Sequence, residues 1–138
     1  MKKEEDIFFS ILRSVLWGEE YAVSPSYEVD WNKVLGLANR QSCLHAFGVW
    51  ILQHHIETPY NQTLRANTFA TMQRQVRLNR LAADVVTLLQ NHGIQAVLMK
   101  GYGLSLLYPD PDMRSFGDVD IYVGEKNYLH ATQLVTEA

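Results

Sequence analysis

The stretch that decides the fold is residues 114–123, RSFGDVDIYV, in which two aspartates flank one apolar residue at the start of a β-branched and aromatic run. Side chains alternate between the two faces of a strand, so Asp118 and Asp120 are predicted to point the same way. The apolar side chains on the opposite face of this strand are predicted to point into a core. They are Val119, Ile121 and Val123. Two carboxylates aimed at one point can bind Mg²⁺, which proteins hold through one or two carboxylates.

The residues before this run predict a strand, a glycine turn and a helix. Residues 94–99, IQAVLM, form a short apolar run after the turn signal NHG at 91–93, which predicts a buried strand. A glycine turn follows at residues 101–103, GYG, and residues 104–108 are predicted to form a short helix that ends before Pro109. This order places backbone N–H groups and the positive end of a helix dipole beside the two aspartates, which suits a triphosphate.

The first two thirds of the chain are predicted to be helical. Residues 4–92 have apolar positions at helical spacing and no strand alternation, whereas residues 94–138 alternate between strands and helices. Three helices are predicted in the first part, over residues 4–17, from Asp30 to about residue 55, and from about residue 60 to residue 91. Asp30 is the expected N-cap of the second helix, and Gly93 the expected stop of the third.

Two helices are predicted to direct apolar side chains toward the core. In the third helix such residues recur at steps of three and four, at Leu78, Leu81, Val85, Leu88 and Leu89. A last helix over residues 125–138 is expected to direct three side chains inward, those of Leu129, Leu134 and Val135. The pattern predicts an α/β (α+β) fold with a helical region at residues 1–92 and a strand-containing region at residues 93–138, together forming one compact unit.

Composition limits the classes of function. With 138 residues, 47% of them hydrophobic, the chain can bury one core and is too short for two ordinary domains. The formal net charge of -3 disfavours nucleic acid as a partner, because nucleic-acid binders usually carry a basic face. The first residues lead into only a brief apolar patch, so neither a signal peptide nor a membrane span is predicted. A single cysteine, Cys43, cannot form an intramolecular disulfide, and a cytoplasmic location is expected.

Several of these residues occur together in a known family. The chain resembles the uncharacterised nucleotidyltransferase family of the polymerase-beta-like superfamily in Lys100-Gly101, in residues 107–111 (LYPDP), in Arg114, in residues 118–121 (DVDI) and in Val123. The resemblance is specific over residues 94–124. It implies a mixed α/β nucleotidyltransferase core, so the expected fold is an N-terminal helical bundle packed on a partial nucleotidyltransferase-type mixed sheet. It also implies the metal-dependent transfer of a nucleoside monophosphate from a nucleoside triphosphate to an acceptor hydroxyl.

The resemblance also implies roles for the residues of the site. Asp118 and Asp120 would be the catalytic pair that holds Mg²⁺ or Mn²⁺. The nucleotide phosphates would be received by the glycine turn, formed by Gly101, Tyr102 and Gly103. The acceptor would be a small molecule or a protein.

Two basic residues are candidates for auxiliary phosphate contacts. Lys100 could contact a phosphate or orient an aspartate, although a lysine at a strand end is more often solvated. Arg114 could neutralise triphosphate charge through its planar fork of donors, or it could tie its own loop to a nearby carbonyl. The resemblance leaves both interpretations of each residue open.

Two features depart from the superfamily pattern. The turn reads Gly-Tyr-Gly at residues 101–103, where the superfamily usually has Gly-Gly or Gly-Ser, and no third carboxylate follows on a later strand. Only Glu125 and Glu137 follow Asp120, and neither is on a predicted strand. These 138 residues are therefore expected to be an incomplete, truncated enzyme. The open strand edge is expected to be covered by a second copy in a homodimer or by further chain.

Two other classes of function stay open at this stage. The chain could be a catalytically inactive nucleotide-binding or protein-interaction module of the same fold, or a helical scaffold with a small β cap. Among the remaining candidates, Asp110 and Asp112 are assigned to turn formation beside proline. The basic row Arg74, Arg77 and Arg80 is assigned to a solvated helix face, although it could line a nucleotide or acceptor channel. The tryptophans Trp17, Trp31 and Trp50 are assigned to the core or to helix packing, although an exposed one could stack on a base.

Overall fold

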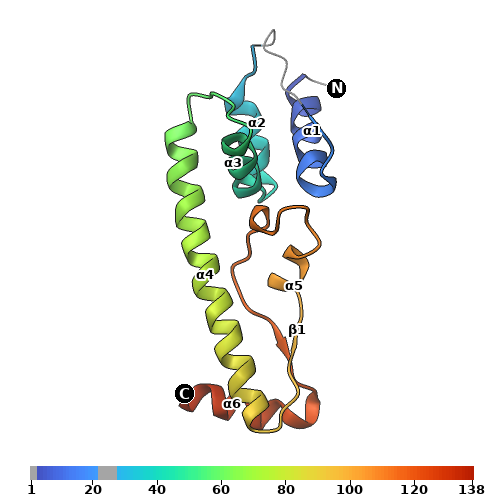
Figure 1. The fold of residues 1–138 in the computed structure, drawn as a ribbon, viewed down its shortest axis with the longest axis vertical. Coiled ribbons are helices and arrows are strands. Elements are labelled where there is room, and N and C mark those ends of the chain that lie inside the picture. The colour runs from blue at the N-terminus through green and yellow to red at the C-terminus, as the bar shows by residue number, and fades with distance from the viewer. Residues whose placement is uncertain (1–2, 22–27) are drawn as a thin grey trace. The chain divides into compact units, whose positions relative to one another are not determined.

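The computed structural model describes residues 3–21 and 28–138. The described chain is mostly helical with a small antiparallel sheet, which confirms the α+β class (Figure 1). In chain order the elements are α1 (Lys3–Trp17), α2 (Trp31–Arg40), α3 (Leu44–Gln53), α4 (Asn61–Asn91), β1 (Val97–Leu98), α5 (Tyr102–Ser105), the 3₁₀ turn η1 (Pro111–Met113), β2 (Ile121–Tyr122), the 3₁₀ turn η2 (Glu125–Asn127) and α6 (Tyr128–Glu137).

The chain divides into two compact units, each made of two stretches. Unit 1 consists of Met1–Met72 and Ser105–Ser115, and unit 2 of Gln73–Leu104 and Phe116–Ala138. Residues 105–115 belong to unit 1 because η1 packs against α3 and buries Met113 in the core of the N-terminal helices. This division in space does not coincide with the predicted boundary along the chain at residue 92.

Unit 1 is a small helical bundle. Helices α1, α2 and α3 lie against one another around one apolar core (Figure 1). The rings of Phe8 and Phe47 stack with their centroids 5.0 Å apart. Beside them the indole N–H of Trp50 donates a hydrogen bond of 2.9 Å to Ser14 Oγ. The buried indole therefore keeps a partner for its one polar group, which limits the cost of placing it in the core.

The single helix predicted from Asp30 to about residue 55 is wrong, because the chain forms two helices there. The break falls at residues 41–43, where Ser42 has a φ of 56° in the left-handed region. After the break, Cys43 N–H donates to Ala38 O at 2.9 Å and closes the end of α2. The turn lets the apolar faces of both helices reach the same core. The predicted N-cap is confirmed, since the Asp30 carboxylate accepts from Lys33 N–H at 3.3 Å.

The close approach of α3 and α4 in unit 1 depends on a glycine. A Cβ added at Gly48 would lie 2.8 Å from Oγ1 of Thr68, a buried residue with a stiff β-branched side chain. Gly48→Ala is therefore expected to lower the free energy of unfolding by about 1–3 kcal/mol, as overpacking does. Urea unfolding followed by circular dichroism measures the change.

Gly36→Ala on α2 is the matched control for this prediction. A Cβ there would meet only the flexible end of Arg40, at 3.5 Å. The alanine should be neutral or should stabilise the helix by up to about 1 kcal/mol. Equal effects of the two substitutions would contradict the packing argument. Adding Thr68→Ala to Gly48→Ala should restore part of the loss.

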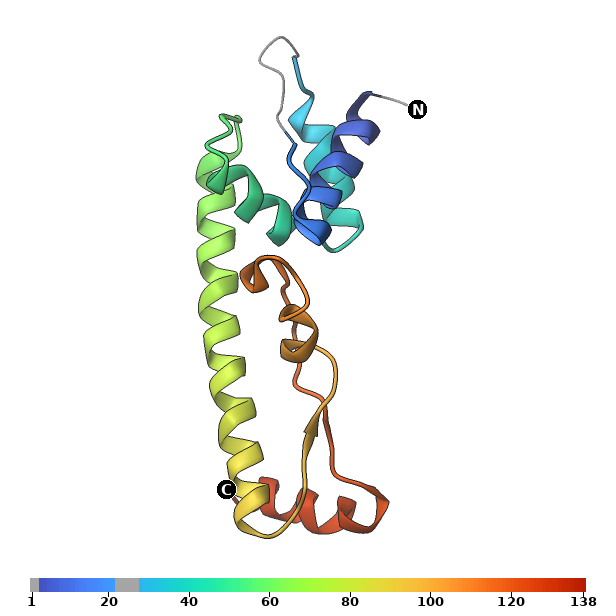
Figure 2. The same cartoon turned by 45° about the vertical axis from the view of Figure 1, so that its right-hand side comes forward.

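Unit 2 packs the last turns of α4 against α6 and the strand pair. The predicted third helix is confirmed as α4, and Gly93 ends it with a φ of 73° while Ile94 N–H donates to Leu89 O at 2.9 Å. Helix α6 crosses the end of α4, as Figure 2 shows in red and yellow. The core between them consists of Leu89, Ile94 and Ala131, with Val85, Ala96, Ile121, Val123 and Leu134 packed against it.

The predicted strands are present but shorter than expected. β1 and β2 pair antiparallel with Val97 opposite Tyr122 and Leu98 opposite Ile121. Each strand has one partner, so few ladder hydrogen bonds hold it and the regular pairing ends after two residues. The alternation predicted around Ile121 persists, because Ile121 is half-buried and Tyr122 is exposed. The prediction of a buried strand over residues 94–99 is wrong, because Val97 is 53% and Met99 57% exposed.

Two helical predictions near the strands are wrong in detail. The helix predicted over residues 104–108 is α5, which begins and ends earlier, and Leu107 is 77% exposed. In α6 the predicted inward residue Leu129 is 81% exposed, while Ala131 and Leu134 face the core. Residues five positions apart on an α-helix point about 140° apart, so Leu129 and Leu134 cannot share one face of α6.

Candidate functional site

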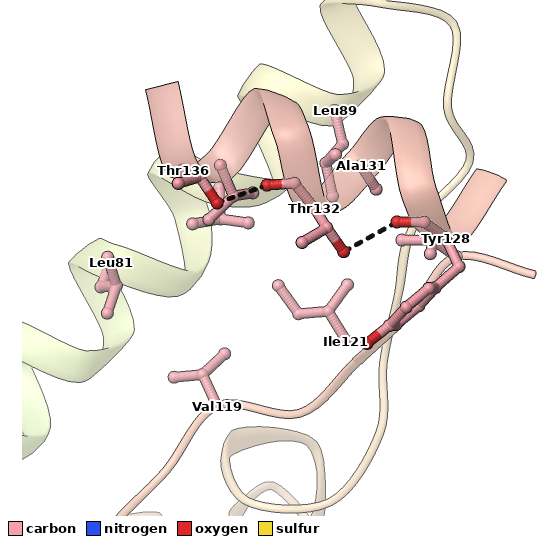
Figure 3. Close-up of a pocket in the computed structure, with 11 residues that line it drawn as sticks. Leu81, Leu89, Val119, Ile121, Tyr128, Ala131, Thr132 and Thr136 are labelled. Atoms are coloured by element: carbon pink, nitrogen blue, oxygen red, sulfur yellow. Dashed lines mark hydrogen bonds between the residues drawn. The ribbon is translucent and has the colours of Figure 1, made fainter. Parts of the chain in front are cut away.

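The two aspartates lie just before β2 and not inside it, which corrects the prediction that they are strand residues. The backbone nevertheless continues alongside β1, because Met99 N–H donates to Asp120 O at 3.0 Å. The predicted inward direction of the apolar residues is confirmed. Val119, Ile121 and Val123 all line one cavity beneath α6 (Figure 3).

This cavity lies on one face of residues 116–123, here called the acidic segment, and the aspartates are on the other face. It has a volume of about 420 Å³ and is lined mainly by apolar side chains of α4, α6 and the acidic segment. Its two threonines use their hydroxyls within α6, since Thr132 donates to Tyr128 O and Thr136 to Thr132 O (Figure 3). By alternation, Asp118 and Asp120 occupy the other face.

Lys100 and Asp120 form an ion pair at the centre of the site. Lys100 Nζ lies 3.1 Å from Asp120 Oδ2. The hydrogen bond and charge of Asp120, and then the charge of Asp118, raise the pKa of Lys100 above its usual value. Both carboxylates therefore act on the same ammonium group. Asp120 Oδ2 is itself shielded from solvent, and the Lys100 ammonium is the charged group beside it.

The donor set fits a hard cation held together with a ligand. In the described ranges, 3–21 and 28–138, no three His, Cys, Asp or Glu side chains converge to form a complete metal cage. Two carboxylates are nevertheless enough for Mg²⁺ when phosphate oxygens and waters complete its octahedron. The residues fit that mode and not a metal site made of protein ligands alone.

The glycine turn packs directly against the acidic segment. Gly101 has a φ of 79°, and a Cβ there would lie 3.5 Å from the Phe116 ring and 3.6 Å from Asp118 O. The strand end and the acidic segment therefore meet at this glycine. Tyr102 and Gly103 are the first residues of α5, which corrects their assignment to the turn. A helix of four residues adds few aligned dipoles, so a phosphate here would be bound mainly by backbone N–H groups and not by the helix dipole.

The other candidates have structural partners. Arg114 belongs to unit 1, where its Nη1 donates to Ser115 O at 3.2 Å, and its contact with a phosphate stays a prediction. Asp110 caps a turn by accepting from Asp112 N–H at 3.0 Å, as predicted. The basic row Arg74, Arg77 and Arg80 is exposed along α4, as predicted for a solvated helix face.

The comparison with known families agrees with this geometry. The model of an uncharacterised nucleotidyltransferase family matches residues 27–138. The chain belongs to this nucleotidyltransferase family. The match includes the Lys100-Gly101 turn and both aspartates, and it confirms the resemblance found in the sequence. A search of curated proteins finds no significant match, and a search of solved structures finds none either.

Membership of the nucleotidyltransferase family indicates nucleotidyl transfer in general, with a nucleotide as substrate. Within residues 3–21 and 28–138, none of the helices has both the length and the apolar character needed to cross a membrane.

One residue beside the candidate site was missed by the sequence analysis. Gln75 of α4 donates from Nε2 to Phe116 O at 2.8 Å, and Phe116 packs against Gly101. Gln75 thus anchors the segment that carries Asp118, which makes it a positioning residue. The bond joins residues 41 positions apart, and no local signal in the sequence marks it. The basic row Arg74, Arg77 and Arg80 lies on the exposed face of the same helix, and the sequence pattern indicated only that face.

Gln75→Glu is expected to loosen the acidic segment, because it replaces the amide donor with a carboxylate that faces a carbonyl. A buried acceptor left without a donor costs about 1–3 kcal/mol of unfolding free energy. Thermal unfolding measures the loss, and nucleotide titration should show weaker binding. Gln73→Glu is the matched control, since Gln73 is exposed on the same helix and should change stability by less than about 0.5 kcal/mol. Indistinguishable variants would remove the positioning role.

Proposed function

We propose that this chain binds a nucleoside triphosphate together with Mg²⁺ or Mn²⁺ at Asp118 and Asp120, and that it transfers the nucleoside monophosphate to an acceptor hydroxyl. The observation that carries the proposal is the Lys100–Asp120 ion pair next to a positive-φ glycine turn. Lys100 responds to the charge of both aspartates, and Gly101 lies against the backbone of Asp118. Family membership supports the same class of reaction.

The proposed reaction forms one bond and breaks one bond. The acceptor oxygen bonds to the α-phosphorus, the bond from that phosphorus to the bridging oxygen of the β-phosphate breaks, and pyrophosphate leaves. The acceptor proton passes to a base or to solvent. The bound cation would neutralise phosphate charge and hold the triphosphate in line for attack.

The chain's own residues orient the triphosphate in this proposal. Asp118 and Asp120 supply the oxygens for the cation. Lys100 offers an exposed ammonium that can exchange Asp120 for a phosphate oxygen, since its side chain is 62% exposed. The turn at Gly101 lets backbone N–H groups approach the phosphates where a Cβ would strain the backbone.

The acceptor is proposed to be a small molecule or a protein. A formal net charge of -3 disfavours a polynucleotide, whose phosphates dominate binding. A second candidate function is a nucleotide-binding module without catalysis. It is favoured by the lack of a third acidic or His/Cys ligand beside the pair in the described part of the chain. Release of pyrophosphate from a triphosphate distinguishes the two functions.

Calorimetric titration with a non-hydrolysable triphosphate, with and without Mg²⁺, tests the proposed site. We expect wild type to bind only when the cation is present, and Asp118→Asn to weaken that binding by about 100-fold or more, because even outer partners of metal ligands contribute 10–100-fold. Asp84→Asn is the control, since Asp84 is an exposed acid on α4 that pairs only with Arg80, at 4.0 Å. Equal affinities of wild type and Asp118→Asn would refute the site.

A further inference from the structure

The face of the strand pair that carries Asp120 continues into a group of apolar side chains. Val97 pairs with Tyr122, and the hydrogen bond from Met99 N–H to Asp120 O places Met99 opposite Asp120. Opposite residues share a face and every second residue returns to it, so Met99, Asp120 and Tyr122 lie on one side of the pair. Asp120 and Tyr122 are separated by about 7 Å along the strand, which is comparable to the length of one sugar.

A pocket lies beside this face. Its volume is about 440 Å³, within the usual range for small-molecule sites, and its lining consists of Met99, Ile121, Tyr122, Val123, Gly124, Glu125 and Tyr128. Three of these large side chains are well exposed, with 57% for Met99, 57% for Tyr122 and 63% for Tyr128. Neighbouring exposed apolar groups of this size are typical of a binding surface.

The charges around the pocket indicate which part of a nucleotide it suits. Glu125 is the charged residue of its lining, and a carboxylate repels phosphate but accepts hydrogen bonds from N–H groups. The cation of the site, Lys100, lies beside Asp120 and does not line the pocket. A polyanionic group is therefore directed toward Lys100. A flat, neutral group with N–H donors suits the pocket.

We propose that this pocket binds the base of the nucleoside triphosphate, with the Tyr122 ring as the stacking surface and Glu125 as an acceptor for a base N–H. The inference rests on the proposed function, because it takes the triphosphate to lie at Asp118 and Asp120. An aromatic ring that stacks on a base typically improves affinity by about 5- to 100-fold. Tyr122 is then a residue for base binding and not for phosphate binding.

Triphosphate ligands with and without a nucleoside test this assignment. Calorimetric titrations in Mg²⁺ would compare inorganic triphosphate with the α,β-methylene analogues of ATP, GTP, CTP and UTP. Wild type should bind at least one nucleotide analogue about 10-fold more tightly than inorganic triphosphate. Tyr122→Ala should remove that difference and leave inorganic triphosphate binding unchanged, whereas Tyr122→Phe should keep it. Leu129→Ala is the control, since Leu129 is 81% exposed and does not line the pocket.

The outcomes separate this inference from the proposed function. Equal binding of nucleotides and inorganic triphosphate by wild type, or an unchanged nucleotide affinity in a folded Tyr122→Ala, would overturn the base pocket and leave the phosphate site standing. Failure of wild type to bind either ligand would overturn both. Photolabelling of wild type with 8-azidoadenosine triphosphate gives a readout that needs no variant. Label within residues 121–128 is expected, and label confined elsewhere would overturn the assignment.

Discussion

Asp120→Asn is expected to abolish pyrophosphate release from a nucleoside triphosphate, with a loss of at least about 100-fold. Asp120 is the aspartate whose oxygen lies 3.1 Å from Lys100, so the substitution removes the proposed cation ligand and the partner of the lysine together. The asparagine keeps the shape of the side chain, so packing around Ile121 should persist. The measurement is a coupled pyrophosphate assay with an extract as the source of acceptor.

Two controls make this result interpretable. Glu137→Gln removes an exposed carboxylate at the end of α6, bonded only to Gln133 at 2.9 Å, and should retain the wild-type rate. Circular dichroism should show that Asp120→Asn is folded. A folded Asp120→Asn that releases pyrophosphate at the wild-type rate would exclude Asp120 from the reaction.

Trp50→Ala is expected to lower the free energy of unfolding by about 3–5 kcal/mol. Trp50 is 1% exposed, stacks on His54 with ring centroids 4.2 Å apart, and donates to Ser14. The alanine leaves a large cavity and an unpaired hydroxyl in unit 1. Small domains have only about 5–15 kcal/mol in total, so the melting temperature measured by calorimetry should fall by about 10 °C or more.

Trp17→Ala is the matched control, and it corrects a prediction. All three tryptophans were assigned to the core or to helix packing, and Trp31 and Trp50 are buried, but Trp17 is 66% exposed at the end of α1. Its removal should change stability by less than about 0.5 kcal/mol. Similar losses for Trp17→Ala and Trp50→Ala would contradict the burial described for unit 1.

Local signals predicted much of the helical part. Asp30 begins a helix and Gly93 ends one because each provides a capping geometry that acts within four residues. The break at Ser42 could not be predicted, since neither glycine nor proline marks it. Serine adopts its left-handed conformation there because two apolar helices share one core. Tertiary packing therefore determines the turn at Ser42, although serine locally prefers a negative φ.

The candidate site shows the same limit. Alternation alone predicted that Val119 and Ile121 face a core while the aspartates occupy the other side. It could not predict that regular pairing ends at Ile121, because ladder length depends on the number of partner strands. Nor could it find Gln75, whose bond to Phe116 exists only once α4 lies beside the acidic segment.

The Lys100–Asp120 ion pair bears on the order in which this protein folds and takes up its ligands. Two carboxylates close together repel each other, and many small metal sites become ordered only when their ion arrives. Here the chain supplies a countercharge of its own, 3.1 Å from one of the aspartates. The acidic segment can thus reach its place beside β1 before any cation is present. Under the proposed function, unit 2 would therefore present an ordered surface to the cation and the triphosphate, and Lys100 would leave Asp120 when they bind.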